Sequence, residues 1–406
     1  MRYAVIGAGV SGLTAAYILR NLGHLTLFEA DERLGGHAHT HDLAAPVDSG
    51  FIVHNESTYP LLTRLFRELG VRTQDAEMSM SVSCAGCGLE YAGARGPRGL
   101  FAGRNASPAY LRLLAQVPRF HREARALLAS GEGDPTVGEF LASGRFTPYF
   151  VRHFATPLIA AVWSCSPGTA LEYPARHLFA FLANHGMLSV TGSPQWKTVT
   201  GGSRSYVTRL ADRLPLTRTS APVRAVVRHA DGVDVVDHSD VRHSFDAAVI
   251  ATHADQALAL LPDPTEAEKR VLDAFTYSRN ETTLHRDTAF LPEARGAQAS
   301  WNYAMDACDT TPDKVRVTYD MNRLQRLPGP DRYLVTLNGP VAEEHVHARM
   351  VYEHPVFTKE SVAAQKELPS LPTPRLAFAG AYHGWGFHED GCRSGVEAAR
   401  ALGVRW

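Results

Sequence analysis

The first part of the chain alternates short apolar runs with one longer segment of helical periodicity. Residues 3–6 and 25–28 are almost continuously apolar, which is typical of strands buried on both faces of a parallel sheet. Residues 13–22, between them, have the pattern of a helix, and a glycine-rich turn at residues 7–12 precedes that helix. This order of strand, turn, helix and strand predicts a βαβ unit.

Both kinds of pattern return along the rest of the chain. Residues 59–69 have a helical pattern that ends at Gly70, a residue type that commonly stops helices. Thr136 and Glu139 have the spacing of a capping box at a helix N-terminus. The same reasoning predicts a long amphipathic helix over residues 108–129 and strands over residues 47–53, 223–227, 247–252, 281–284, 315–319 and 333–337.

These elements fall into blocks of two kinds. Residues 1–75, 195–261 and 372–406 carry buried strands and helices like those of the first βαβ unit. Residues 76–194 are mainly helical in pattern, and residues 262–371 alternate like antiparallel strands. Because 406 residues exceed one ordinary core, we expect two interleaved domains. The predicted fold class is α/β, with a discontinuous Rossmann-like domain formed by the first three blocks and a smaller α+β domain formed by the other two.

The turn at residues 7–12 has the spacing of a dinucleotide-binding fingerprint. Gly7 makes the tight turn, Gly9 lets the backbone approach a pyrophosphate, and Gly12 lets the helix pack on the strand. The helix N-terminus offers N–H groups and a favourable dipole to the phosphates. Glu29, at the end of the second strand, suits the hydroxyl pair of a ribose. This part of the chain is therefore predicted to bind an adenine dinucleotide.

Two further motifs favour FAD over NAD. After Glu29 the chain continues through Arg33 to the paired glycines Gly35 and Gly36, which resembles the extended fingerprint of glutathione-reductase-like flavoproteins. Near the C-terminus, a strand-like segment ends at Gly380, and residues 386–395 lead into a helix. This arrangement is similar to the C-terminal flavin motif of the superfamily of amine oxidases, protoporphyrinogen oxidases and phytoene desaturases. The resemblance implies FAD, with a backbone N–H at the helix start beside the flavin O2 position.

The resemblance also assigns residues to the cofactor. We expect noncovalent FAD, because the chain has Tyr382 and His383 where some relatives place a flavin-linking cysteine. Ala381 departs from the superfamily, which often has a carboxylate there for the ribityl chain. The predicted cofactor-binding residues are Gly7, Gly9, Ser11, Gly12, Glu29, Ala30, Arg33, Gly35, Gly36, His37, Gly50, Phe51, Val223, Ala251, Gly380, Ala381, Phe387, His388 and Glu389.

The same C-terminal motif supplies the residues expected at the substrate. Its alignment with the amine oxidase motif puts Phe387 where one wall of the aromatic substrate cage stands, here without a hydroxyl. His388 and Glu389 follow it and would supply either a polar end for the site or only their backbone N–H groups. The predicted catalytic, flavin-facing residues are Phe387, His388 and Glu389, with Trp163 and Trp301 as further neighbours.

Several segments extend the resemblance over the whole chain. Residues 38–60, 194–203, 251–256, 300–303 and 384–391 look like those of a bacterial flavoprotein group associated with cyclopropane-fatty-acid-synthase-like methyltransferases. The resemblance implies a hydrophobic small-molecule or lipid substrate, a fatty acyl chain above all, and a lipid methyltransferase as a partner. Hydride removal would then be of the desaturase or oxidase type. No second GxGxxG follows, so we expect dioxygen rather than NADPH to reoxidise the flavin.

Three alternatives stay open at this point. A fatty-acid double-bond isomerase would use FAD without any external oxidant. An amine oxidase commonly has a lysine-bound water near the flavin, and only Lys197 among the five lysines lies in a flavin-domain segment. A flavin-binding partner of a lipid methyltransferase would show no turnover of its own.

Two clusters resemble metal sites, and we assign no metal to either. Cys84 and Cys87 have CxxC spacing, but no second pair follows to complete a zinc site, so we interpret them as incidental thiols. His37, His39 and His41 alternate, so their imidazoles would face one way if they lay on a strand. His37 directly follows the paired glycines, where relatives place an arginine. We therefore interpret it as a polar residue beside the flavin.

Charge and hydropathy exclude two classes of protein. The formal net charge is −1, so no overall field favours nucleic acid or an anionic membrane. No leader-like segment precedes the first strand, and no apolar run reaches the roughly eighteen residues that span a bilayer. The five cysteines are an odd number, which fits reduced thiols. We expect a cytoplasmic protein without a transmembrane segment, with the membrane periphery as the alternative location.

Overall fold

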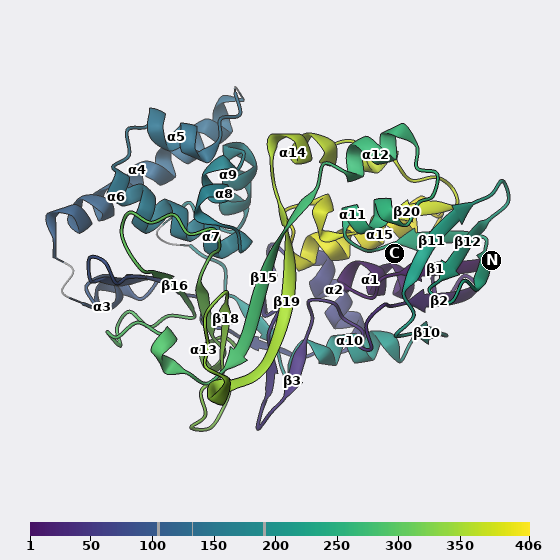
Figure 1. Cartoon of the computed structure of the whole chain (residues 1–406), viewed down its shortest axis with the longest axis horizontal. Coiled ribbons are helices and arrows are strands. Elements are labelled where there is room, and N and C mark those ends of the chain that lie inside the picture. The colour runs from purple at the N-terminus through teal and green to yellow at the C-terminus, as the bar shows by residue number, and fades with distance from the viewer. Residues whose placement is uncertain (104–105, 132, 190–191) are drawn as a thin grey trace.

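A parallel sheet of five strands forms one end of the molecule in the computed structural model, which describes residues 1–103, 106–131, 133–189 and 192–406 (Figure 1). Its strands are ordered β10-β2-β1-β14-β20. The last residue of β1 (Arg2–Ile6) pairs with the last residues of β2 (His24–Phe28) and β14 (Ala247–Ile250). β10 (Thr217–Arg218) and β20 (Leu376–Phe378) complete the sheet. The carboxyl ends of the strands therefore share one edge, which is where such sheets bind ligands.

Layers on both faces of this sheet explain the continuous apolar run of β1. Tyr3 and Val5 pack in one cluster with helices on the first face, and Ala4 and Ile6 pack in another on the second face. Because alternate side chains of a strand point to opposite faces, all four buried positions of β1, Tyr3 to Ile6, are apolar, and only the exposed Arg2 at its start is charged. The first face is covered by α1 (Val10–Leu19), α2 (Pro60–Leu69), α10 (Arg204–Ala211) and α15 (His388–Ala401), and the second by β11 (Val223–Arg228), β12 (Val233–Asp237), β13 (Arg242–Phe245), α11 (Ala254–Ala259), α12 (Glu266–Leu272) and α14 (Lys359–Gln365). The predicted α/β, Rossmann-like class is confirmed.

Two predicted boundaries in this part of the chain were wrong. α1 spans Val10–Leu19 rather than residues 13–22, and because all of its residues are buried, no change of polarity marks its start. The strand predicted over residues 47–53 is two short strands, β4 (Pro46–Asp48) and β5 (Val53–His54). Between them the Phe51 N–H donates to the His37 carbonyl at 2.7 Å, so the chain bends toward another loop. The remaining short strands here are β3 (Thr40–Asp42), β6 (Thr73–Asp75) and β9 (Lys197–Val199).

A mixed sheet of seven strands lies beside the parallel sheet, in the order β19-β15-β18-β17-β16-β7-β8 (Figure 1). The strands predicted over residues 281–284, 315–319 and 333–337 lie mostly within its longer or shifted strands. Its members are β7 (Met80–Cys84), β8 (Leu89–Gly93), β15 (Thr276–His285), β16 (Trp301–Met305), β17 (Val317–Asp320), β18 (Leu334–Leu337) and β19 (Val346–Val356). The parallel pairing of β7 with β16 joins two parts of the chain that are far apart in sequence. We propose that the two sheets mark the two domains.

Helices from residues 108–184 pack above the seven-stranded sheet, and the short α3 lies at its left end (Figure 1). α4 (Pro108–Ser130) is the long predicted helix, and its Phe120 contacts the rings of Phe140, Phe150 and Phe179. The predicted capping box of Thr136 is confirmed at the start of α5 (Val137–Ser143). Further helical segments are α3 (Gly96–Leu100), α6 (Pro148–Phe150), the π-helical turn η1 (Val151–Ala155), α7 (Thr156–Trp163), α8 (Pro167–Glu172), α9 (Ala175–Asn184) and, between β17 and β18, α13 (Met321–Leu324). No helix within the described residues is long and apolar enough to cross a membrane.

Candidate functional site

The carboxyl edge of the parallel sheet holds the glycine turn that was predicted to bind a pyrophosphate. Gly9 is the N-cap of α1, and a Cβ built on it would meet no protein atom within 4 Å. A Cβ on Gly12 would lie 1.9 Å from the Gly7 carbonyl oxygen, so Gly12 serves close packing. A Cβ on Gly36 would lie 3.2 Å from the Gly9 Cα. The two glycine motifs therefore meet in one cradle, which opens beside the N-terminus of α1.

Glu29 lies at the end of β2, beside this cradle. One of its carboxylate oxygens accepts the Ala8 N–H at 2.7 Å, and the other accepts the Asp31 N–H at 3.0 Å. The Ala221 N–H donates to the Glu29 carbonyl at 2.9 Å, which brings the start of β11, at Val223, to the same edge. A carboxylate has about four lone-pair sites, so Glu29 keeps acceptors for a ribose while its position is fixed.

Arg33 and the residue that follows the paired glycines have different roles. The Arg33 guanidinium donates to the Gly36 carbonyl at 2.8 Å, so it braces its own loop. The His37 ring packs on Tyr352, with ring centroids 4.9 Å apart, and its Nε2 is enclosed without a hydrogen-bond partner among the described residues. Burial, with a further contribution from His354, holds the pKa of His37 well below its usual value. A neutral, enclosed nitrogen without a partner fits contact with a bound cofactor.

The three alternating histidines do not share one strand, because only Thr40–Asp42 is extended and paired. His39 lies 3.1 Å from the Tyr352 hydroxyl through Nδ1, and His41 lies 2.9 Å from the Ser49 hydroxyl through Nε2. Their rings pack on each other with centroids 4.1 Å apart. The imidazoles of His39 and His41 thus contact hydroxyl groups, whereas Nε2 of His37 has no such partner among the described residues.

The C-terminal motif reaches the same edge through a close helix crossing. A Cβ on Gly395 would lie 2.4 Å from the Ser11 carbonyl oxygen, so α15 packs directly on α1. The Gly380 N–H donates to the Ser394 hydroxyl at 2.9 Å, which fixes the end of β20 on α15. Ala381 follows, half-buried and without a carboxylate. This crossing brings the N-terminus of α15 beside the glycine turn.

Asp390 organises the loop that leads into α15, and sequence reasoning missed it. Its carboxylate accepts the Trp385 N–H at 2.9 Å and the Phe387 N–H at 3.1 Å, and it pairs with Arg393. Burial raises its pKa above the usual value, and Arg393 opposes that shift. An acid at the third position of a helix is the signal that could have found it.

The side chains of His388 and Glu389 are engaged in packing rather than held in an open site. The His388 ring stacks on Phe51, with centroids 3.7 Å apart, and its Nε2 lies 3.1 Å from the Tyr206 hydroxyl. Burial lowers the pKa of His388 to about 3, so the imidazole is neutral. The Glu389 carboxylate accepts two backbone N–H groups at the start of α2, each at 3.0 Å. The backbone N–H groups of both residues are what they offer to a flavin, and this contact stays a prediction.

Phe387 belongs to a wall of aromatic rings. It stacks on Phe181 with centroids 4.6 Å apart and meets Trp163 edge-on at 6.1 Å. The Trp163 indole donates to the Trp385 carbonyl at 3.1 Å, which holds the wall against the C-terminal loop. Trp163 is therefore a neighbour of Phe387, as predicted. Trp301 instead packs edge-on against Tyr319 within the seven-stranded sheet.

Sequence reasoning also missed Asp48, a fully buried carboxylate at the end of β4. It accepts the Ser203 N–H at 2.9 Å and the Gln325 amide at 3.0 Å, and the Thr40 hydroxyl also donates to it. Burial raises the pKa of Asp48 to about 6. In the sequence, the signal for Asp48 is one acid inside an apolar run that predicts a strand.

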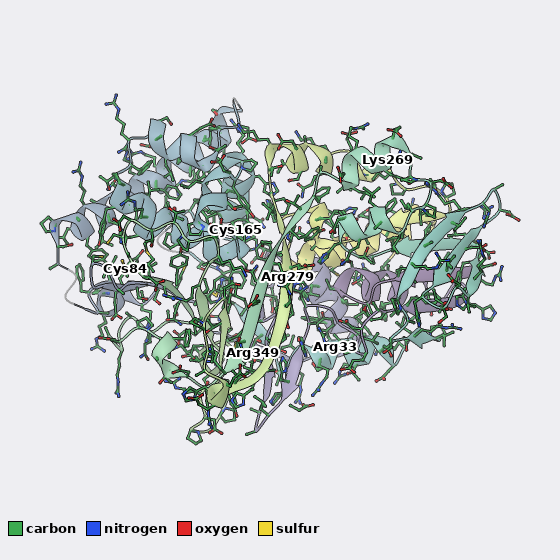
Figure 2. The ribbon with its side chains drawn as sticks, viewed as in Figure 1. Arg33, Cys84, Cys165, Lys269, Arg279 and Arg349 are labelled. Atoms are coloured by element: carbon green, nitrogen blue, oxygen red, sulfur yellow. The ribbon has the colours of Figure 1, made fainter. Side chains whose placement is uncertain are left out.

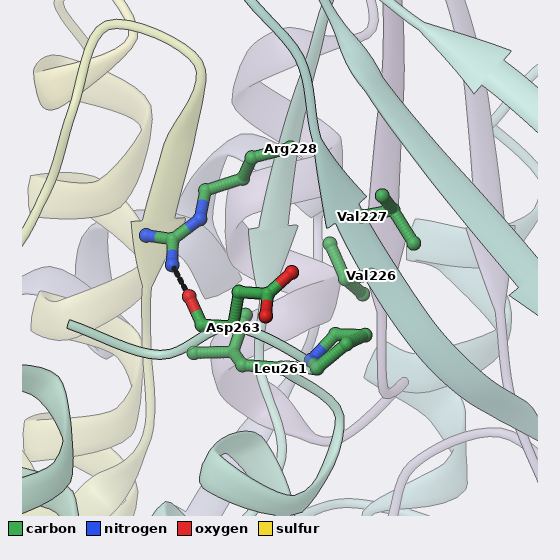
Figure 3. A pocket seen from close by; sticks show the side chains of 6 residues that line it. Val226, Val227, Arg228, Leu261 and Asp263 are labelled. Atoms are coloured by element: carbon green, nitrogen blue, oxygen red, sulfur yellow. Dashed lines mark hydrogen bonds between the residues drawn. The ribbon is translucent and has the colours of Figure 1, made fainter.

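Among the described residues, the hollows include one beside α2 and one beside β11. The larger, of about 540 Å³, is lined by His54, Thr63, Phe66 and other residues of α2 and its neighbouring strands. The smaller, of about 40 Å³, lies between β11 and the loop after α11, where Arg228 donates to the Asp263 carbonyl at 2.6 Å (Figure 3). It has room for water but not for a flavin.

Comparison with known proteins adds a family to this geometry. The profile of a family described as flavin containing amine oxidoreductase matches residues 10–403. Coproporphyrinogen III oxidase of Mycobacterium leprae is 28% identical over 317 residues, which cover 71% of this chain and 68% of that protein. Cyclohexylamine oxidase from Brevibacterium oxydans IH-35A superimposes with a TM-score of 0.70 at 17% identity, covering 99% of this chain and 98% of that one. A fatty acid isomerase from P. acnes, described as producing CLA, superimposes with a TM-score of 0.68 at 16% identity, covering 97% and 96%. At these identities the two structures show the fold.

Proposed function

The chain belongs to the family of flavin-containing amine oxidoreductases, and we propose that, within this family, it removes hydride from an apolar substrate, a fatty acyl chain above all. It is an FAD-dependent oxidoreductase, and its residues fit the cofactor, since the open cradle at Gly9, the fixed carboxylate of Glu29 and the unpartnered Nε2 of His37 lie along one sheet edge. When bound, FAD supplies a two-electron acceptor. The protein supplies the binding, the orientation and the exclusion of water.

The aromatic wall around Phe387 is the observation that carries the choice of substrate. Phe387, Phe181 and Trp163 pack ring against ring, and the indole N–H of Trp163 is already satisfied by a backbone carbonyl. Such a wall holds no carboxylate for an ammonium group, and a ring face attracts a cation by only about 0.5–2 kcal/mol. Burial of an alkyl chain contributes about 0.8 kcal/mol per methylene, which corresponds to about fourfold in affinity. An apolar chain would therefore gain more from this wall than a short polar amine.

The positions of the lysines support the same proposal. All five lysines lie in the described part of the chain, and four of them are exposed. Lys197 pairs with Asp75 at 3.4 Å and with Glu56 at 3.7 Å. Because its ammonium group is held by two carboxylates, Lys197 is poorly suited to hold the water that amine oxidases commonly place near the flavin.

The substrate proposal is tested by turnover in air. The purified flavoprotein is supplied with free fatty acids, fatty acyl phospholipids, aliphatic amines and coproporphyrinogen III, and hydrogen peroxide is measured. Two electrons and two protons pass from the substrate to dioxygen, so one peroxide forms for each double bond introduced. We expect peroxide with acyl lipids, with KM falling about fourfold per added methylene until the pocket is filled. Phe387→Ala should raise KM and weaken the dependence of KM on chain length. The matched control Phe101→Ala, at an exposed phenylalanine, should change neither.

The other outcomes of this assay separate the alternatives. Double-bond migration in the recovered lipid without peroxide would identify an isomerase. Peroxide with amines or with coproporphyrinogen III alone would contradict the acyl substrate, and the latter would follow the similarity to the mycobacterial enzyme. No turnover with any substrate, from a protein that holds FAD, would favour a partner protein without catalysis of its own.

A lipid methyltransferase partner and a place at the membrane periphery are further parts of this proposal. They rest on the sequence resemblance described above. They also rest on the location of long acyl chains in membranes, which an enzyme that acts on these chains must reach. Co-purification with a cyclopropane-synthase-like methyltransferase, compared with an unrelated methyltransferase, is the direct check. Equal recovery with both would contradict the partnership.

A further inference from the structure

Four metal-binding side chains converge at the end of the molecule opposite the parallel sheet. Cys84 and Cys87 form the CxxC pair for which the sequence offered no second pair. The fold brings Cys308, from the loop after β16, and His153, from η1, to the same place. The three sulfur atoms and one imidazole nitrogen all lie within 4.8 Å of one another. The ligands missing from the sequence pattern are thus supplied by two distant segments.

The spacing of these atoms matches the edges of a tetrahedron around one metal ion. Zinc bonds sulfur at about 2.3 Å and imidazole nitrogen at about 2.0–2.1 Å, so tetrahedral angles set about 3.8 Å between two sulfurs and about 3.6 Å between sulfur and nitrogen. The Cys84 and Cys308 sulfurs are 3.7 Å apart, and the Cys87 sulfur is 3.7 Å from His153 Nε2. Both pairs therefore have the separation that a shared ion requires.

The backbone around the CxxC pair has the form of a metal-binding turn. β7 ends at Cys84, β8 begins at Leu89, and Gly88 has a positive φ of +69° in the turn between them. The Gly88 N–H donates to the Cys84 carbonyl at 2.9 Å, which closes the turn that carries both cysteines. The thiolate is the form of cysteine that binds metals.

Close backbone contact holds Cys308 against this turn. The Ala85 N–H donates to the Met305 carbonyl at 2.9 Å, which extends the β7–β16 pairing up to the cluster. A Cβ on Gly86 would lie 2.9 Å from the Ala307 Cα, so only glycine allows the loop of Cys308 to approach this far. The position of the third sulfur is therefore set by the backbone.

A hydrogen bond to a backbone carbonyl fixes the tautomer of His153. Its Nδ1 lies 3.1 Å from the Tyr149 carbonyl oxygen, which can only accept, so Nδ1 carries the proton. Nε2 is left with a lone pair directed at the Cys87 sulfur and the rest of the cluster. Ligating histidines usually donate their other N–H in this way. The Tyr149 ring also stacks on the imidazole, with centroids 4.0 Å apart, which restricts its rotation.

We propose that Cys84, Cys87, Cys308 and His153 form a structural site for one Zn²⁺ ion. Three thiolates and one imidazole fill a tetrahedral shell and leave no position for a substrate, as in structural rather than catalytic zinc sites. Borderline-soft sulfur and nitrogen donors select zinc over calcium or magnesium. Four ligand atoms within 4.8 Å of one another enclose a single ion and not a multi-iron cluster.

The place of the site in the molecule gives it a structural role. The ion would tie the β7–β8 hairpin, the loop after β16 and the helical layer at η1 into one unit. Cys84 and His153 are buried, whereas Cys87 is exposed and offers a path of entry. Figure 2 shows Cys84 at the left end of the molecule, well apart from Arg33 beside the cofactor cradle. Loss of the ion should therefore leave FAD binding intact.

The proposal is tested on the full chain with its FAD. The reduced protein is loaded with Zn²⁺, excess metal is removed, and bound zinc is counted by mass spectrometry for the wild type, Cys87→Ser, His153→Ala and the matched control Cys165→Ala. We expect one zinc per chain in the wild type and the control, and less than a tenth of that in the two ligand variants. Cys87 is exposed, so Cys87→Ser should fold and keep its flavin even if a buried variant does not.

Cobalt gives a spectroscopic test that distinguishes cysteines that bind the metal from cysteines that only pack in the core. Co²⁺ in the wild type should show thiolate-to-metal charge transfer, and its intensity should fall by about a third in Cys87→Ser if that variant retains cobalt at high concentration, since three thiolates become two. A chelator should lower the unfolding temperature of the wild type but not that of Cys87→Ser. A flavin-loaded wild type without zinc, equal zinc in wild type and ligand variants, or a Cys84–Cys308 disulfide would each overturn the proposal.

Discussion

At the scale of single residues, Gly9 is a position where the cofactor, and not the protein fold, requires a glycine. Its backbone, at φ −70° and ψ −179°, is accessible to any residue, and no protein atom lies within 4 Å of a built Cβ. The protein alone would therefore tolerate a side chain at this position. We predict that Gly9→Val abolishes FAD binding while the unfolding temperature of the apoprotein changes little, because the side chain would occupy the space of the pyrophosphate. Flavin absorbance and thermal unfolding measure the two effects separately. If Gly9→Val kept its full complement of FAD, the proposal that the pyrophosphate lies against this turn would be wrong.

Substitution of Glu29 should weaken FAD binding less than Gly9→Val does. Glu29 contributes hydrogen bonds, whereas a side chain at position 9 would fill the space of the cofactor. Charge-assisted hydrogen bonds are worth about 1.5–3 kcal/mol, so Glu29→Ala should weaken FAD binding by about ten- to a hundredfold. Part of this loss comes from the Ala8 and Asp31 N–H groups, which lose their acceptor. Titration of the apoprotein with FAD gives the value, and Glu32→Ala, at an exposed acid in the same loop, is the matched control. Equal affinity in Glu29→Ala and the control would contradict a ribose contact.

At the scale of elements, the sequence predicted segments whose polarity changes at their ends. α2 ends at Gly70 as expected, and Thr136 caps α5 as expected, since local chemistry decides both. α1 lacks such a signal because all of its residues are buried. The strand predicted over residues 47–53 breaks because Phe51 bonds to the His37 carbonyl. Contacts of that kind come from tertiary structure and leave no periodic pattern.

The crossing of α1 and α15 is the element-scale contact that brings both flavin motifs together. Gly395 lies at the crossing, where a Cβ would be 2.4 Å from the Ser11 carbonyl oxygen. We predict that Gly395→Ala destabilises the protein by about 1–3 kcal/mol, as overpacking usually does, and lowers its FAD content as the helices separate. Chemical denaturation and flavin absorbance report these effects. Glu397→Ala, on the exposed face of α15, should leave both within error of the wild type. Wild-type stability of Gly395→Ala would mean that the two helices are not in this contact.

At the scale of the whole molecule, buried imidazoles make the fold sensitive to acid. Burial lowers the pKa of His54, His285 and His354 to about 4, against about 6.5 when unfolded. Between these values the unfolded chain binds more protons, so stability is present above about pH 6.5 and is lost as the pH falls toward 4. Each fully buried imidazole contributes up to about 3 kcal/mol to this loss. Asp48 works in the opposite direction, because its pKa is raised to about 6.

Denaturation at pH 7.5 and at pH 5 tests this prediction. The wild type should lose stability between the two, and His285→Gln, which replaces a buried imidazole bonded to Thr336, should lose less. His24→Gln, at an exposed histidine, should follow the wild type. An equal loss in all three proteins would show that His285 does not contribute to the acid response.

The two sites differ in how far they could be predicted from the sequence. The cofactor motifs are contiguous, because a glycine turn needs its neighbours in sequence to form the cradle at Gly9. The proposed zinc site depends on the parallel pairing of β7 with β16, which brings Cys308 to Cys84 across more than half of the chain. The roles of Glu389 and His388 also depend on partners in α2 and α10. Long-range partners of this kind are visible only once the sheets are assembled.

Anaerobic mixing of the FAD-loaded enzyme with single substrates tests the central claim most directly. Without dioxygen, a substrate that gives up hydride leaves the flavin reduced, and its visible absorbance is lost. We predict loss of absorbance with long-chain fatty acyl lipids, and none with short aliphatic amines at the same concentration. Loss of absorbance with the amines alone would contradict the proposal that this enzyme oxidises an apolar acyl chain.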